Sequence, residues 1–150
     1  MTQMLKLAAQ AIRYAWAAPY TLLGIGLALL LGLKVSHRGG ALIFEGSGSW
    51  LGRPGPHVAV TLGHSIIASA PLPTSVLAHE LVHVHQYEQW GPLTVPVWVA
   101  GLVIGALRTG HPYVDNPLER EAYMIGEAMN PPTGTCPDCG QPLSRHVRTH

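Results

Sequence analysis

The sequence predicts an α+β fold: a small β-sheet, two helices that pack against it, and an N-terminal transmembrane helix. Three short β-rich runs, ALIFEG, HVAVTLG and HSIIAS, precede two segments that have helical patterning and clear ends. The charged fraction of 11% is about half of the ~25% that is usual in soluble domains. This deficit comes from two long uncharged runs, and the first of them is long enough to cross a membrane.

The first uncharged run, YAWAAPYTLLGIGLALLLGL, lies between Arg13 and Lys34. Its length matches the about 20 apolar residues that a helix needs to cross a bilayer. Trp16 and Tyr20 are typical of the aromatic belt at a membrane interface. A cleaved signal peptide and a buried core helix are the alternatives, but no small-residue cleavage site follows the run. We therefore expect residues 1–38 to form a membrane anchor, and the flanking basic residues slightly favour a cytoplasmic domain.

The next segment, 39–130, is expected to form one domain, followed by a Cys/His tail at 131–150. Its β-rich runs predict short strands, and the glycine between the last two indicates a bend or a tight hairpin. A first helix is expected over residues 75–89 and a second over 117–129, where Asn116 and the proline after it are typical of a helix N-terminus.

The second uncharged run is an apolar insertion at 92–107, between the two predicted helices. Pro92 and Pro96 leave only about ten continuous residues for a helix, too few to span a bilayer. We expect a hydrophobic hairpin, a core helix, or a segment that dips into the membrane face. The G-x-x-x-G match at 101–105 is weak support for helix pairing.

The first helix contains a His-Glu-x-x-His motif, at residues 79–83. Because residues four apart share a helix face, His79 and His83 can bind one ion, and their imidazoles suit zinc. Glu80 projects about 100° round the helix, where it can act as a base on metal-bound water. A chance match among nine histidines is the alternative, but the apolar neighbours and clear helix ends favour a metal site. His85 points away from this face and is expected to be solvated or to support a ligand.

A catalytic zinc site needs a third protein ligand, and Glu119 and Glu121 in NPLEREAY are the candidates. With Asn116 as the N-cap, Glu119 occupies the third helical position, so a capping box explains this glutamate without a metal. The two glutamates flank the apolar stripe of the helix on opposite sides. Periodicity therefore does not choose between them.

A family resemblance adds to this interpretation. HELVH, followed some tens of residues later by EREAY, resembles the gluzincin group of zinc metallopeptidases. The nearest likenesses are the minimal minigluzincins and the catalytic core of the membrane-bound CAAX prenyl endopeptidases. The resemblance covers roughly residues 59–129 and implies a minimal zincin-like fold, whose edge strand lines the cleft.

The resemblance also implies a role for each matching residue. Glu80 becomes the general base, and Ala122 the small residue that lets the two helices pack closely. Relatives often have Asp after that alanine, where this chain has Tyr123, and this departure leaves Glu121 as a rival ligand. The implied zinc ligands are His79, His83 and Glu119.

The reaction that this site implies is peptide-bond hydrolysis by a zinc-activated water, whose proton Glu80 takes and passes to the departing amine. A donor to the oxyanion is also needed, and His111, Tyr113 and Tyr123 are all candidates. We therefore expect a membrane-anchored zinc metallopeptidase, an endopeptidase rather than an exopeptidase, whose partners are a peptide or protein substrate and the lipid bilayer.

Two other classes of function stay open. One is a catalytically silent metal-binding or peptide-recognition domain at the membrane, and the other is a small membrane structural protein whose histidines are incidental. A net charge of +1, with no basic stripe, argues against a nucleic-acid partner.

The tail contains a Cys-x-x-Cys turn, which is typical of zinc binding, and two histidines follow it at a ligand-like interval. A second, structural zinc is one interpretation of this tail. A tail with two thiols, or one with a disulfide, is the other. The four candidate ligands are Cys136, Cys139, His146 and His150.

Overall fold

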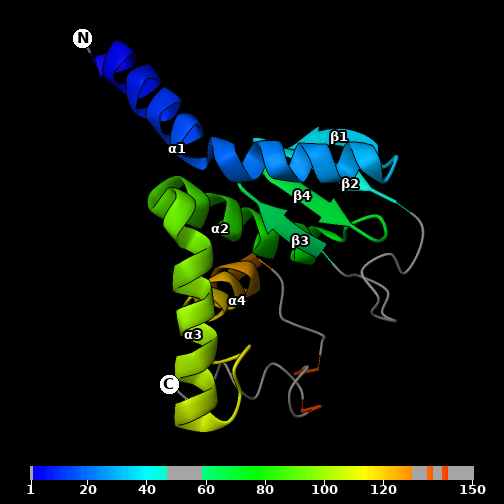
Figure 1. Ribbon diagram of the computed structural model, residues 1–150, viewed down its shortest axis with the longest axis vertical. Coiled ribbons are helices and arrows are strands. Elements are labelled where there is room, and N and C mark those ends of the chain that lie inside the picture. Colours follow the sequence, from blue (N-terminus) through cyan, green and yellow to red (C-terminus); the bar gives the residue numbers. More distant parts are fainter. Residues whose placement is uncertain (1, 47–58, 130–134, 137–139, 142–150) are drawn as a thin grey trace.

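The computed structural model of the chain describes residues 2–46, 59–129, 135–136 and 140–141. The elements, in chain order, are α1 (Thr2–Leu30), β1 (Lys34–Arg38), β2 (Ala41–Glu45), β3 (Ala59–Leu62), β4 (Ser65–Ala68), α2 (Thr74–Trp90), the 3₁₀ helix η1 (Gly91–Leu93), α3 (Thr94–Thr109) and α4 (Pro117–Met129). The predicted α+β class is confirmed (Figure 1).

The sheet is mixed, and its four strands follow the order β1-β2-β4-β3. Strands β2 and β4 are parallel, whereas β1 and β3 pair antiparallel at the two edges. Gly63, with a φ of 61°, makes the tight turn of the β3–β4 hairpin, one of the two arrangements that the sequence allowed. Strand β1 was not predicted, because we assigned its residues to the anchor. The domain boundary expected at residue 38 falls at the end of β1, before the turn to β2.

The sheet buries both of its faces, since successive side chains of a strand point to opposite sides. Ile43 and Ile66 pack with Val84 of α2 on one face. Phe44 and Ile67 pack with Ala28 of α1 on the other face. The core therefore has three layers, with α1 on one side of the sheet and α2 on the other, and α4 packs against α2 (Figure 1).

Helix α1 takes part in this packing through its second half. Ala17 and Ala28, in its second half, are completely buried. Residues 3–16, in its first half, are exposed throughout. The start of α1 therefore projects from the domain, as Figure 1 shows at the N-terminus, while Tyr14 already stacks on His64 of the β3–β4 turn.

Among the described residues, one helical segment, Thr74–Thr109, is long and apolar enough to cross a membrane by length and composition. Only 22% of its most apolar window is buried. This segment consists of α2, η1 and α3, and it does not lie near the N-terminus, where we expected the membrane span. Gly91, with a φ of 52°, changes the direction of the chain between α2 and α3 (Figure 1).

The apolar insertion forms η1 and then α3, a helix of 16 residues, longer than the ten or so that we expected. Pro96 lies in the first turn of α3, where the missing N–H costs no helical hydrogen bond, and this is why the proline does not break the helix.

Candidate metal centre

The His-Glu-x-x-His motif lies in the middle of α2, the helix predicted for it. Apolar residues of α2, such as Val82 and Val84, are buried, while His79 and His83 are half-buried on the side that faces α4. The Nε2 atoms of the two imidazoles lie 3.1 Å apart, so the i, i+4 spacing directs both at one point.

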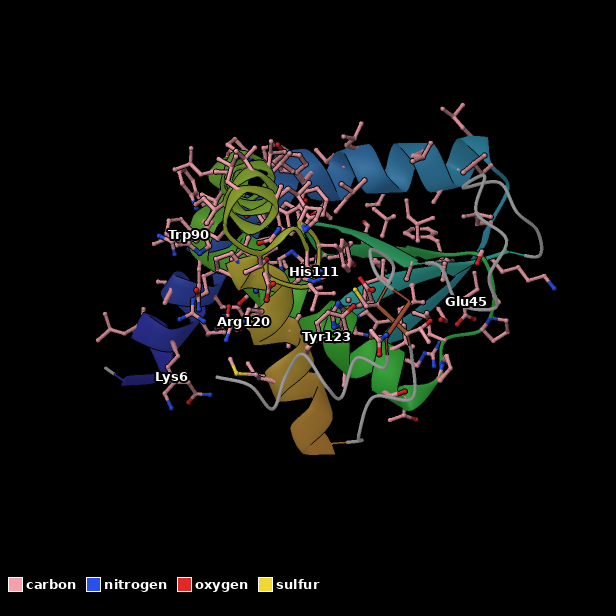
Figure 2. All side chains as sticks on the ribbon, turned by 90° about the horizontal axis from the view of Figure 1, so that it is seen from below. Lys6, Glu45, Trp90, His111, Arg120 and Tyr123 are labelled. Carbon is pink, nitrogen blue, oxygen red and sulfur yellow. The ribbon has the colours of Figure 1, made fainter. Side chains whose placement is uncertain are left out.

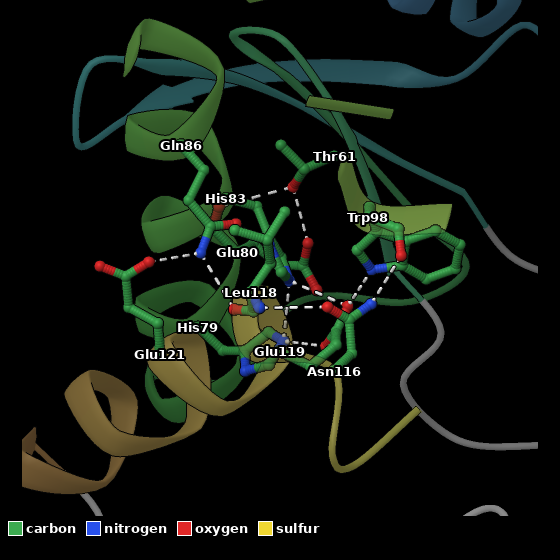
Figure 3. Close-up of polar contacts among 10 residues, drawn as sticks. All are labelled: Thr61, His79, Glu80, His83, Gln86, Trp98, Asn116, Leu118, Glu119 and Glu121. Carbon is green, nitrogen blue, oxygen red and sulfur yellow. Dashed lines mark hydrogen bonds and ion pairs between the residues drawn. The ribbon is translucent and has the colours of Figure 1, made fainter. Parts of the chain in front are cut away.

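Glu119, near the N-terminus of α4, completes a group of three (Figure 3). Its Oε2 lies 3.4 Å from His79 Nε2, and its Oε1 lies 3.6 Å from His83 Nε2. One potential ligand atom from each of the three residues lies within 4.8 Å of the others, so the group could hold a metal ion. Glu119 itself is only 2% exposed.

The rival glutamate, Glu121, points elsewhere. Its Oε2 accepts a hydrogen bond of 2.9 Å from Gln86 Nε2 on α2. The structure therefore brings Glu119, and not Glu121, to the two histidines.

The capping box expected at the start of α4 is only half formed. Asn116 Oδ1 accepts a hydrogen bond from the Leu118 N–H, as an N-cap does. Glu119, however, does not turn back to cap the helix, because its Oε1 accepts a hydrogen bond of 2.7 Å from the indole N–H of Trp98 on α3. Asn116 Nδ2 also donates to the Trp98 carbonyl, at 3.0 Å. Helix α3 thus holds both the N-cap and the carboxylate of α4.

Gln86, one turn after His83, orients that histidine. Its Oε1 lies 2.8 Å from His83 Nδ1, and an amide oxygen can only accept, so Nδ1 carries the proton and the lone pair of the neutral ring lies on Nε2. The Gln86 amide nitrogen donates to the Leu118 carbonyl at 2.9 Å, which joins α2 to α4. His85 is exposed and pairs with Glu88 at 3.3 Å, in keeping with the prediction that it points away from the site.

Glu80 is buried beside the edge strand β3. Its Oε2 accepts a hydrogen bond of 2.6 Å from the hydroxyl of Thr61, a β3 residue (Figure 3). Glu80 lies on the same helix as the two histidines but takes no part in the group of three, as the 100° step along the helix predicted.

The negative charge of Glu119 makes a positive charge favourable beside it, either on an imidazole or on a metal ion. Burial disfavours the charged form of His83, but the hydrogen bond and charge of Glu119, with the charge of Glu80, raise its pKa to about 9. Burial also disfavours the ionised form of Glu119, but the two imidazoles outweigh it and hold the pKa of Glu119 well below its usual range. Without a metal, a proton on His83 therefore supplies the positive charge.

One carboxylate oxygen of the group, Glu119 Oε2, is close to an imidazole but has no hydrogen bond within the described part of the chain. This oxygen is buried. Such an atom costs free energy unless a donor or a cation satisfies it. Two imidazoles and a carboxylate are also the donor set of many catalytic zinc sites. The residues present therefore fit a zinc ion.

Two tyrosines border the group. The rings of Tyr123 and His79 are 4.6 Å apart. Burial and the negative charge of Glu119 raise the pKa values of Tyr113 and Tyr123, so both hydroxyls stay protonated and can donate hydrogen bonds. The third candidate donor, His111, lies in the turn after α3, where its N–H is 3.3 Å from Thr109 Oγ1.

Only part of the predicted second zinc site lies in the described residues. Cys136 is buried and packs with Val114, Tyr113 and Tyr123. The other three candidate ligands, Cys139, His146 and His150, lie outside the described residues.

Three residues that contact the site were not predicted: Thr61, Gln86 and Trp98. Gln86 could have been predicted from the sequence, because it lies three residues after His83 and therefore on the same face of α2. Thr61 and Trp98 reach the site only through the packing of β3 and α3.

Comparisons with protein-family models, with curated proteins and with solved structures found no match to this chain.

Proposed function

We propose that this protein is a zinc-dependent metallopeptidase with a minimal zincin-like fold that works at a membrane. The observation that carries the proposal is the convergence of His79, His83 and Glu119 within 4.8 Å, beside a buried Glu80 that is not part of the group. Three candidate ligands and a neighbouring carboxylate are the parts that metal-assisted hydrolysis needs.

Zinc bound by these three residues would lower the pKa of a bound water and polarise the substrate carbonyl. Glu80, which Thr61 holds in place, takes the proton of the attacking water and then passes it to the departing amine. Tyr113 and Tyr123 are protonated donors beside the group, and one of them stabilises the oxyanion.

The position of β3 supports a peptide substrate. This strand is at one edge of the sheet, and the side chain of its Thr61 contacts Glu80, so β3 lies next to the proposed general base. An extended peptide can pair with such an edge through backbone hydrogen bonds. Edge pairing fits an endopeptidase, because the substrate chain can continue on both sides of the site.

Turnover of a mixed peptide library by zinc-loaded protein tests this proposal, with cleavage detected by mass spectrometry. We expect cleavage by the wild type and none by Glu80→Gln, although that variant keeps its zinc. Glu88→Gln, on the same helix but outside the site, is the matched control and should cleave like the wild type. Full turnover by Glu80→Gln would exclude the mechanism, whereas zinc binding without any wild-type cleavage would favour a silent metal-binding domain.

A further inference from the structure

Two helices of this domain have their large apolar side chains on the outside. In α1 the buried positions facing the sheet include Ala17, Gly24 and Ala28. In α3 the buried positions include Gly101 and Gly105. A helix on the surface of a soluble domain has the opposite arrangement, with large apolar residues inside and polar residues outside.

The outward faces consist of leucine, valine and isoleucine. In the second half of α1, Leu29 is 69% and Leu30 is 87% exposed, and in α3 Leu107 is 82% exposed. Small residues inside and large aliphatic residues outside are typical of helices that are surrounded by lipid. The residues that carry these two faces are Leu22, Leu23, Leu29, Leu30, Val103 and Leu107.

The charges on the two helices fit an anionic lipid surface. Neither α1 nor α3 contains an Asp or Glu, and their charged residues are all basic: Lys6, Arg13 and Arg108. Lys6 is exposed in the first half of α1 and Arg108 lies in the last turn of α3, whereas Arg13 is 3.8 Å from Glu88 of α2. Basic residues at the ends of apolar helices are attracted to the headgroups of an anionic bilayer.

The packing of α1 argues against a helix that crosses the bilayer. Its second half lies along the sheet, so a span through the hydrocarbon would draw strand β1 in with it. Strand β1 is an edge strand with exposed Lys34, His37 and Arg38, and an open sheet edge is not tolerated in lipid. Helix α3, with 16 residues, is about 24 Å long and shorter than the ~30 Å hydrocarbon core.

The two helices are placed to meet one flat surface. They run in different directions in Figure 1, yet Figure 2 shows α3 and the second half of α1 on the side of the sheet opposite α4, whereas the first half of α1, which carries Lys6, lies on the side of α4. A surface parallel to both helices contacts both outward faces. We propose that the second half of α1 and α3 together form a face that docks in the plane of an anionic bilayer without crossing it. This proposal rests on the membrane attachment proposed above.

Binding of full-length protein to preformed vesicles tests the docking face. We expect sedimentation with vesicles of phosphatidylcholine and phosphatidylglycerol, and weaker binding when phosphatidylglycerol is omitted. Leu29→Glu/Leu30→Glu and Val103→Glu/Leu107→Glu should each lower the binding constant by at least about tenfold. Met124→Glu/Ile125→Glu is the matched control, because these two exposed residues lie on α4, and it should bind like the wild type.

A second measurement separates in-plane docking from a membrane span. In a Cys136→Ser/Cys139→Ser background, Gln3→Cys and Lys34→Cys place one thiol before and one after the apolar run of α1. An impermeant maleimide-polyethylene glycol reagent should add two polymers to each vesicle-bound chain. One polymer per bound chain, with two after detergent, would show that α1 spans and would overturn the proposal. No binding to either vesicle would instead remove the membrane attachment itself, and a stable dimer in solution would assign the apolar face to a second copy.

Discussion

The indole N–H of Trp98, on α3, donates a hydrogen bond of 2.7 Å to Oε1 of Glu119, on α4. One side of α3, the helix formed by the apolar insertion, therefore holds the candidate metal ligand Glu119, while the other side of α3 is exposed. Partners of this kind fix the orientation of a metal-binding carboxylate, and their loss typically weakens metal binding 10–100-fold.

Trp98→Phe should therefore weaken zinc binding by about tenfold, because phenylalanine keeps an aromatic ring but cannot donate to Glu119. Competition with a chromophoric chelator measures the affinity. Trp90→Phe is the matched control, since Trp90 is 43% exposed and lies outside the site. Equal affinities for Trp98→Phe and the wild type would mean that the hydrogen bond does not position the ligand.

Gln86→Leu should reduce both stability and zinc affinity. The change removes the partner of His83 Nδ1 and the donor to the Leu118 carbonyl, and burying such groups without partners costs about 1–3 kcal/mol. Urea unfolding of the metal-free protein measures the first effect and chelator competition the second. His85→Ala, an exposed residue of the same helix, should change neither. A Gln86→Leu protein with wild-type stability would contradict the proposed link between α2 and α4.

Thr61→Val should lower turnover by about tenfold and leave zinc content unchanged. Valine has nearly the same shape as threonine but cannot donate to Glu80 Oε2, so the carboxylate that moves the proton is no longer held. Steady-state cleavage and elemental analysis on one preparation separate the two quantities. Loss of zinc together with activity would show that Thr61 acts on the ligands instead.

The stability of the metal-free protein should depend on pH through His83. Its pKa is about 9 in the folded protein, above its ordinary value of 6.5. The stabilisation is therefore complete below pH 6.5, and it is lost as the pH rises through about 9. Urea unfolding with a chelator present, between pH 6 and 9.5, should show this decrease for the wild type and a smaller one for His83→Asn. Zinc affinity should rise over the same range, because the metal needs a neutral imidazole.

Two glycine substitutions should have opposite effects. Alanine is normally the better residue in a helix, by roughly 0.5–1 kcal/mol. A Cβ at Gly26 meets nothing within 4 Å, so Gly26→Ala should stabilise the fold. A Cβ at Gly101 would lie 2.3 Å from Asn116 Oδ1, so Gly101→Ala should destabilise it. Thermal unfolding of the two variants side by side tests whether α3 packs this closely on the N-cap of α4.

The sequence predicted the local features of this protein well. The ends of α2 and α4 were marked by Gly91 and by the Asn116-Pro117 pair, and the helix spacing placed His79 and His83 on one face. Gly63 predicted a bend or a tight hairpin between β3 and β4, and the structure has the hairpin. These features depend on neighbouring residues, whose propensities and spacing the sequence displays directly.

Features that depend on distant contacts were not predicted. Nothing local distinguishes Glu119 from Glu121, because the choice depends on how α4 packs against α2 and α3. The run in α1 was interpreted as an anchor from its length and aromatic flank, and the packing of its second half on the sheet has no local signal. Strand β1 was missed because its exposed edge position gives it no apolar pattern.

Zinc content per chain tests the central claim most directly. The full-length Cys136→Ser/Cys139→Ser protein removes the thiols of the tail, and elemental analysis after reconstitution and dialysis counts the remaining metal. We expect about one zinc per chain, a large loss in Glu119→Gln, and no loss in Glu121→Gln, the matched change two residues further along α4. No bound zinc after reconstitution, or an equal zinc content in Glu119→Gln, would contradict the assignment of these residues as a metal centre.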